Sequence, residues 1–230
     1  MKDLSRRHAL GAVGGLAGAT ALGTLGMASA SAATPVSTTG RRDAASAQWR
    51  AGRSANGWEI LDEATLYPIE GSGRSVYLAA GDAATLLLYV ARRFHYEIDQ
   101  LRDGDVSGHT TSRGISAPCE SNYLSGTAIT IRPHAYPLGV RGGLYPHEQV
   151  VVRDILAELD GAVTWGGDLE TPKESHFEIA LKPTHPKVKG VARKIRGWRD
   201  TPSRGAGATD AFAPERLSNA KAFRSRLARG

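Results

Sequence analysis

The feature that most constrains the fold is an amphipathic pattern between residues 82 and 101. Its apolar residues recur at steps of three and four, the spacing that places side chains on one face of an α-helix. Asp82 stands at the start of the pattern, where an acidic side chain can cap the first turn. We therefore expect one long helix whose buried face contains Leu86, Leu87, Val90, Phe94, Ile98 and Leu101.

Strand and helix patterns alternate after this helix. The alternation in GTAITI at residues 126–131 predicts a strand, and YPHEQVVVRDILAEL at 145–159 predicts a helix with Pro146 in its first turn. Two short strands at 162–165 and 176–181 bracket a loop and predict a hairpin. The second helix should bury Val150, Val151, Ile155, Leu156 and Leu159. Together these elements predict an α+β fold, a small antiparallel sheet packed with helices.

Cysteine content and chain length limit how the fold can be stabilised. At 230 residues the chain has room for one ordinary domain with attachments, which we place at residues 54–200. Cys119 is the single cysteine, so an internal disulfide framework is excluded. Stability must come from the hydrophobic core.

The end of the chain is rich in cations. A basic segment around Ile195 and Trp198 predicts a helix that covers the edge of the domain, and residues 201–230 predict a disordered basic tail. The cations either contact an anionic cell-wall polymer or form a solvated face. Nucleic acid is not an expected partner, because base-recognition motifs and stacking aromatics are missing.

The beginning of the chain predicts export. SRRHAL at residues 5–10 precedes an uncharged run of Gly, Ala and Leu, a pattern typical of a twin-arginine signal. Small residues at 28–32 suit a signal peptidase, so residues 1–32 would be removed and residues 33–53 would form a flexible linker. A membrane anchor is the alternative, but the many glycines make the run weakly apolar. We expect a secreted protein, extracellular or associated with the cell wall.

Two motifs carry a resemblance to a known family. SNYLSGTAIT at residues 121–130, followed by WGGD at 165–168 and SHFEI at 175–179, resembles the zinc D-Ala-D-Ala carboxypeptidases and dipeptidases of bacterial cell walls. That family shares its fold with the Hedgehog signalling domain. Its first motif reads S-x-H-x-x-G-x-A-x-D, and its second ends in an acid, two residues and a histidine. The likeness covers about Asn56 to Trp198.

The resemblance implies a metal centre and its chemistry. In the family, the His and Asp of the first motif and the His of the second hold Zn²⁺, and the fourth position stays open for water. The metal lowers the pKa of that water, and the acid accepts its proton before the attack on an amide.

This chain departs from the family at the positions that matter most. Tyr123 stands at the first ligand position and Thr130 at the aspartate position, while His176 matches the second histidine. Lys173 replaces the acid. Phenol and hydroxyl groups are poor zinc ligands, one imidazole alone cannot hold the ion, and an ammonium group repels it. The matching frame positions are Ser121, Gly126 and Ala128. We expect a pseudoenzyme that has lost its zinc site and has no cofactor.

Other residues match the substrate site of the family. Arg113 matches an arginine that orients a substrate carboxylate, although it could equally pair with a loop acid. Trp165 and Gly166 would form a wall beside His176, or else a turn with a core aromatic. Glu178 would orient that histidine or lie on the sheet face. The expected substrate-binding residues are Arg113, Ser121, Trp165 and Gly166.

A rearranged zinc site is the alternative. Glu174 lies two residues before His176 and could act as a base in place of Lys173. The other nearby imidazole or thiol ligands are Cys119, His109 and His134, whose spacing matches no known metal cage.

Three functions remain open at this point. The first is a non-catalytic module that binds peptidoglycan stem peptides or another peptide C-terminus. The second is an active zinc D-alanyl-D-alanine carboxypeptidase with shifted ligands. The third is a structural or interaction protein in which the basic tail matters more than the groove.

Overall fold

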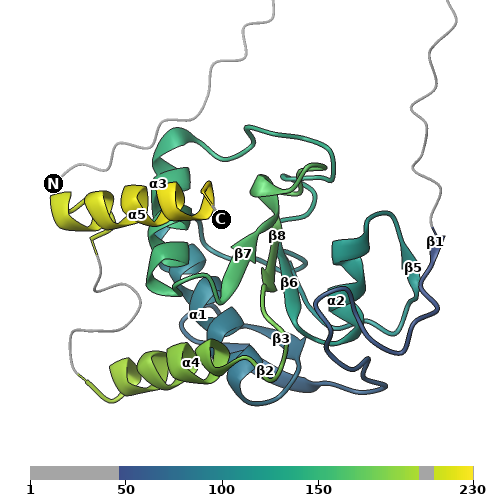
Figure 1. Cartoon of the computed structure of the whole chain (residues 1–230). Helices are drawn as coiled ribbons and strands as arrows, with labels where there is room; N and C mark the ends of the chain where they lie inside the picture. Colours follow the sequence, from purple (N-terminus) through teal and green to yellow (C-terminus); the bar gives the residue numbers. More distant parts are fainter. Residues whose placement is uncertain (1–46, 202–209, 230) are drawn as a thin grey trace, which may run out of the picture. The chain divides into compact units, whose positions relative to one another are not determined.

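A four-stranded antiparallel sheet forms the centre of the structure (Figure 1). The computed structural model describes residues 47–201 and 210–229. The predicted signal peptide, and the predicted linker up to residue 46, lie outside the described residues. The strands run in the order β4 (Val106–Ser107), β6 (Ala128–Ile131), β8 (His176–Ile179) and β7 (Val163–Trp165). The predicted strand and hairpin are therefore confirmed, and the fold is α+β.

The sheet has two different faces because side chains alternate along each strand. Ile129, Phe177 and Val163 point to one face and are almost fully buried in the core. Thr130 and His176 are register partners on the other face. Residues of the first face pack against helices, whereas the second face carries the polar residues of the family motifs.

Helix α1 (Asp82–Glu97) confirms the amphipathic pattern, with two corrections at its ends. Gly81 is the N-cap, with a φ of 87° that a side chain would strain. Asp82 is the first helical residue and makes no capping bond; its carboxylate pairs with Arg196 at 2.9 Å. Ile98 is the C-cap, and Leu101 is buried in the following loop.

Helix α3 (Pro146–Glu158) begins at the predicted proline. Val150 was expected to be buried, but it is half-exposed and Val152 is fully buried instead. Asp154 also turns inward, where it meets Arg93 of α1 at 2.8 Å, so the buried face of the helix is shifted slightly from the predicted one.

Helix α4 (Pro186–Arg199) is the predicted basic helix, and it packs against α1 (Figure 1). Its buried face consists of Val188, Val191, Ala192 and Ile195. None of the helices in the described part of the chain is long and apolar enough to cross a membrane.

The predicted disordered tail is wrong for residues 210–229. Pro214–Leu227 form helix α5, which packs against α3. Phe223 is buried, and Arg216 pairs with Asp154 at 2.5 Å and with Glu158 at 2.8 Å. Fully buried Arg93 pairs with the same two acids, so one ionic cluster joins α1, α3 and α5. The helix is thus stabilised by tertiary contacts that the local sequence does not reveal.

Order begins before residue 54, so the flexible-linker prediction is wrong for residues 47–53. Strand β1 (Ala47–Gln48) pairs with β5 (Gly114–Ile115), and a further hairpin joins β2 (Thr65–Ile69) to β3 (Arg74–Leu78). The 3₁₀-helix η1 (Pro118–Glu120) leads into the short helix α2 (Ser121–Leu124), and η2 (Gly166–Asp168) follows β7.

Candidate functional site

The family motifs meet on the polar face of the sheet. Thr130 on β6 lies opposite His176 on β8, and Tyr123 on α2 reaches the same place. The Tyr123 hydroxyl is 2.6 Å from Nδ1 of His176, and the two rings meet edge to face with centroids 5.2 Å apart. The three positions that the motif resemblance assigns to metal ligands therefore lie close together.

Both ring nitrogens of His176 are already engaged. Nδ1 meets the Tyr123 hydroxyl, and Nε2 lies 2.7 Å from Oε2 of Glu178. The same carboxylate oxygen accepts a bond of 2.6 Å from the Asn122 amide. A carboxylate requires a donor, so Nε2 carries a proton, and in the neutral imidazole Nδ1 then accepts from the phenol. Glu178 thus orients the histidine, one of the two roles that the sequence leaves open.

Tyr123 is held in its neutral form. Burial raises the pKa of its phenol far above the ordinary value, and the nearby carboxylates of Glu120 and Glu178 act in the same direction. The phenol therefore remains a hydrogen-bond donor at neutral pH. The Thr130 hydroxyl is itself buried and makes no hydrogen bond within the described residues.

Lys173 places a positive charge at the position where the motif resemblance predicts an acid. Its Nζ lies 2.7 Å from Oε1 of Glu120 and 5.1 Å from the centre of the Tyr123 ring. Burial tends to raise the pKa of Glu120, but the hydrogen bonds from Lys173 and the Ser116 N–H outweigh it and lower the pKa. The ion pair and the cation–π contact fix this ammonium group beside the phenol.

These residues do not fit a zinc ion. The donor set consists of one imidazole, one neutral phenol and one hydroxyl, and the last two are poor zinc ligands beside imidazole and carboxylate. Among the residues that the structure describes, no three His, Cys, Asp or Glu side chains come together in a way that could hold a metal.

Glu174, the candidate replacement base, binds backbone N–H groups instead. Its carboxylate is buried and accepts three backbone N–H bonds of 2.7 to 3.0 Å, from Gly142, Gly143 and Leu144. These bonds anchor the loop before α3. The structure does not bring the Glu174 carboxylate to His176.

Among the other candidate ligands, Cys119 lies near this site, since the Glu178 carboxylate acts on its thiol and the thiol acts on the Tyr123 phenol. Nε2 of His109 lies 2.9 Å from the Leu61 carbonyl, and His134 is exposed. Cys119 is half-buried, and burial raises the pKa of its thiol to about 11. At neutral pH this thiol is therefore mostly protonated.

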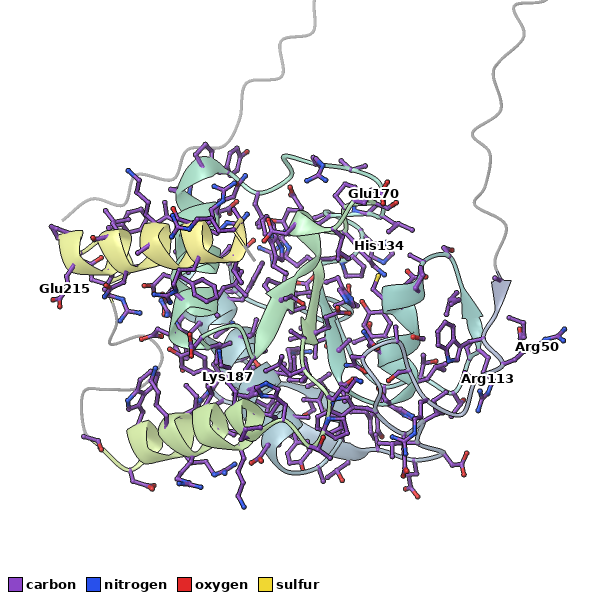
Figure 2. All side chains as sticks on the ribbon, in the orientation of Figure 1. Arg50, Arg113, His134, Glu170, Lys187 and Glu215 are labelled. Carbon is purple, nitrogen blue, oxygen red and sulfur yellow. The ribbon has the colours of Figure 1, made fainter. Side chains whose placement is uncertain are left out.

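The predicted substrate residues lie in different settings. Ser121 is fully buried, and its hydroxyl accepts from the Ala55 N–H and donates to the Pro118 carbonyl. Half-buried Arg113 lies at the edge formed by β1 and β5, next to Arg50 (Figure 2). Its Nη1 donates to the carbonyls of Trp49 at 3.4 Å and Ala51 at 3.2 Å. Among the described residues it has no acidic partner, so the expected pairing with a loop acid is not present.

Gly166 borders His176 as the resemblance implies, whereas Trp165 pairs with Phe177 on the opposite face of the sheet and belongs to the core, the alternative that the sequence left open. The Trp165 indole donates to the Glu174 carbonyl at 2.7 Å, and the ring is buried. A Cβ at Gly166 would lie 2.8 Å from Cβ of His176 and 2.3 Å from the Lys173 carbonyl. Only glycine allows this close approach of the loop to the strand.

Two site residues were not predicted, Asn122 and Glu120. Asn122 lies inside the first motif, next to Tyr123 at the first ligand position. This place in the motif could have identified it as a site residue. Glu120 precedes the motif, but its partner Lys173 is 53 residues away and no local pattern links the two.

Comparison with known proteins finds no family model, no curated protein and no solved structure that matches this chain. The likeness to the zinc peptidases therefore rests on the two motifs alone.

Proposed function

We propose that this chain is an exported, cell-wall-associated protein with a Hedgehog/DD-peptidase-like domain that binds peptides without cleaving them. Peptidoglycan stem peptides are the expected ligand class. One observation carries the non-catalytic assignment: Tyr123 and Glu178 occupy both nitrogens of His176. A single imidazole held in this way, with a neutral phenol and a hydroxyl beside it, does not make up a zinc site.

The charges around the site support the same proposal. A hydrolase of this kind needs a base beside the attacking water, and here Lys173 lies over Tyr123 instead. Glu174 is committed to three backbone N–H groups. Neither side chain is free to accept a proton from water, so binding without cleavage suits the site better than hydrolysis.

Arg113 supports recognition of a peptide C-terminus. A guanidinium group binds a carboxylate through two parallel bonds, and within the described residues only Nη1 of Arg113 is engaged. The remaining donors suit a terminal carboxylate that arrives from solvent.

The charges of α4 support a weaker contact with an anionic wall polymer. Lys187, Lys194 and Arg196 are bonded to Asp160, the Glu158 carbonyl and Asp82. Lys189 and Arg193 are exposed and form no ion pair within the described residues. Two available cations are consistent with a modest electrostatic contribution from this helix.

Two measurements on the exported chain, purified without a metal-affinity tag, test the proposal. Metal analysis gives the zinc content, and titration with diacetyl-L-Lys-D-Ala-D-Ala gives peptide binding and any hydrolysis. We expect a folded, metal-free protein that binds the peptide saturably and leaves it intact. Arg113→Ala should abolish binding, whereas the matched variant Arg50→Ala should not.

Two outcomes would overturn the proposal. Hydrolysis that a chelator stops would establish the zinc carboxypeptidase instead. Binding that is missing, or that is unchanged by Arg113→Ala, would remove the basis for a C-terminal peptide site at this arginine.

A further inference from the structure

The C-terminal end of α5 lies beside strand β7 (Figure 1). Residues of these two elements line a cavity of about 720 Å³. Its walls are mostly apolar. On one side it is lined by Val163, Thr164 and Trp165, and on the other by Phe223, Arg224 and Leu227. The volume falls within the range of roughly 300–1,000 Å³ that is usual for ligand sites.

Strand β7 lies at the edge of the four-stranded sheet, and one of its residues has unpaired backbone groups. The Ala180 N–H donates to the Ala162 carbonyl at 3.0 Å, and Thr164 is the register partner of Glu178. Since hydrogen bonding alternates along an antiparallel edge, Val163 directs its N–H and C=O away from β8. In the described part of the chain, neither group has a hydrogen-bond partner.

Val163 is only 1% exposed, so these two backbone groups are not solvated either. Buried backbone donors and acceptors without partners are rare in folded proteins. An added β-strand would supply an acceptor and a donor to the same residue, as happens when a peptide extends a sheet edge. The cavity beside Val163 therefore suits an extended peptide better than a compact ligand.

The charges at the cavity favour a carboxylate on that peptide. Arg153 and Asp168 neutralise each other through paired bonds, and Glu178 is held by Asn122 and His176. Arg224 is exposed at the cavity and forms no ion pair within the described residues. It is the cation of this cavity that remains free for a ligand.

We propose that the cavity between β7 and α5 binds an extended peptide, which pairs with the Val163 backbone as an additional strand and places its terminal carboxylate at Arg224. The C-terminal end of α5 forms the outer wall and shifts outward to admit the strand, because Val163 is covered in the free protein. This inference goes beyond the proposed function, because it adds a second peptide site at the sheet edge, separate from the one proposed at Arg113.

A selection on the exported chain tests this site. The probe is a library of short random L-peptides with free carboxyl termini, and the affinity of enriched peptides is measured for the parent chain and its variants. Arg224→Glu should weaken binding by at least about tenfold. Ala228→Trp should abolish it, because this exposed residue at the end of α5 lines the cavity. Arg193→Glu, an equal charge change on the exposed face of α4, is the control and should have no effect.

The peptide itself provides a second control. Amidation of its carboxyl terminus should weaken binding as much as Arg224→Glu, and the amide resonance of Val163 should shift on binding. Peptides that bind Arg224→Glu and Ala228→Trp normally but lose affinity for Arg113→Ala would overturn this inference and uphold the proposed function. If neither the library nor the D-Ala-D-Ala peptide binds, both proposals fail.

Discussion

The hydroxyl of Tyr123 and Nδ1 of His176 are 2.6 Å apart, with the phenol edge to face against the imidazole. This bond lies where the motif resemblance expects a metal ion. It joins α2 to β8, so the elements that a metal would hold together are held by hydrogen-bonded side chains. The Glu178 carboxylate completes the array by binding the other ring nitrogen of His176.

Tyr123→Phe tests the structural value of this bond. The variant keeps the ring but leaves the buried Nδ1 of His176 without its donor, which should lower the free energy of unfolding by about 1–3 kcal/mol. Urea denaturation measures the loss. Tyr77→Phe is the control, because Tyr77 is 51% exposed and its hydroxyl has no partner within the described residues. Equal effects of the two variants would show that the bond to His176 contributes nothing.

Glu174→Gln tests whether this carboxylate anchors the loop before α3. The amide cannot accept three N–H bonds, and its NH₂ group would face backbone donors, so the free energy of unfolding should fall by at least about 2 kcal/mol. Exposed Glu170 gives the matched control, Glu170→Gln, with a change within about 0.5 kcal/mol. A fully stable Glu174→Gln protein would contradict the anchoring role.

Cys119 should react slowly with alkylating reagents. Burial raises the pKa of its thiol to about 11, above the ordinary 9.0, so only a small fraction is thiolate at neutral pH. The rate constant with iodoacetamide should therefore rise about tenfold per pH unit from about pH 7 to about pH 10. The same protein in denaturant should instead level off near the ordinary pKa. A plateau near pH 9.0 in the folded protein would show that the thiol is not shielded.

The ion pair between Lys173 and Glu120 should make stability depend on acid pH. The pKa of Glu120 is lower in the folded protein than its ordinary value of 4.5. Its contribution is therefore fully present above that value and is lost as the pH falls through the lower, folded pKa. Between about pH 5 and about pH 3 the parent chain should lose stability faster than Glu120→Gln. Parallel pH profiles in urea denaturation would contradict this assignment.

Local patterns predicted the elements whose apolar residues repeat regularly. Helices α1 and α3, the strand β6 and the hairpin of β7 and β8 all follow from such repeats. The convergence of Tyr123, Thr130 and His176 also followed from the motifs, because β6 and β8 pair directly.

The remaining features depend on contacts between distant residues. Helix α5 has a largely polar sequence and is held by Phe223 and by Arg216 on the acids of α3. The role of Glu174 depends on backbone groups more than 30 positions away, at Gly142 and Gly143. Neither contact produces a regular pattern in the sequence. The sequence therefore predicted a disordered tail at residues 210–229 and a candidate catalytic base at Glu174.

Restoring the family residues together tests the motif resemblance itself. Thr130 and His176 are register partners, and the Tyr123 side chain ends at His176, so Tyr123→His and Thr130→Asp should direct new ligands toward the same point. Lys173→Asp removes the ammonium group above that point and restores the acid. The triple variant should bind roughly one zinc ion per chain, measured by competition with a chromophoric chelator, while the parent chain should bind none.

Tyr123→His alone should not suffice, because two imidazoles without the carboxylate leave the tetrahedral site incomplete. A triple variant that folds but takes up no zinc would show that the likeness to the zinc peptidases does not extend to the geometry of their metal centre.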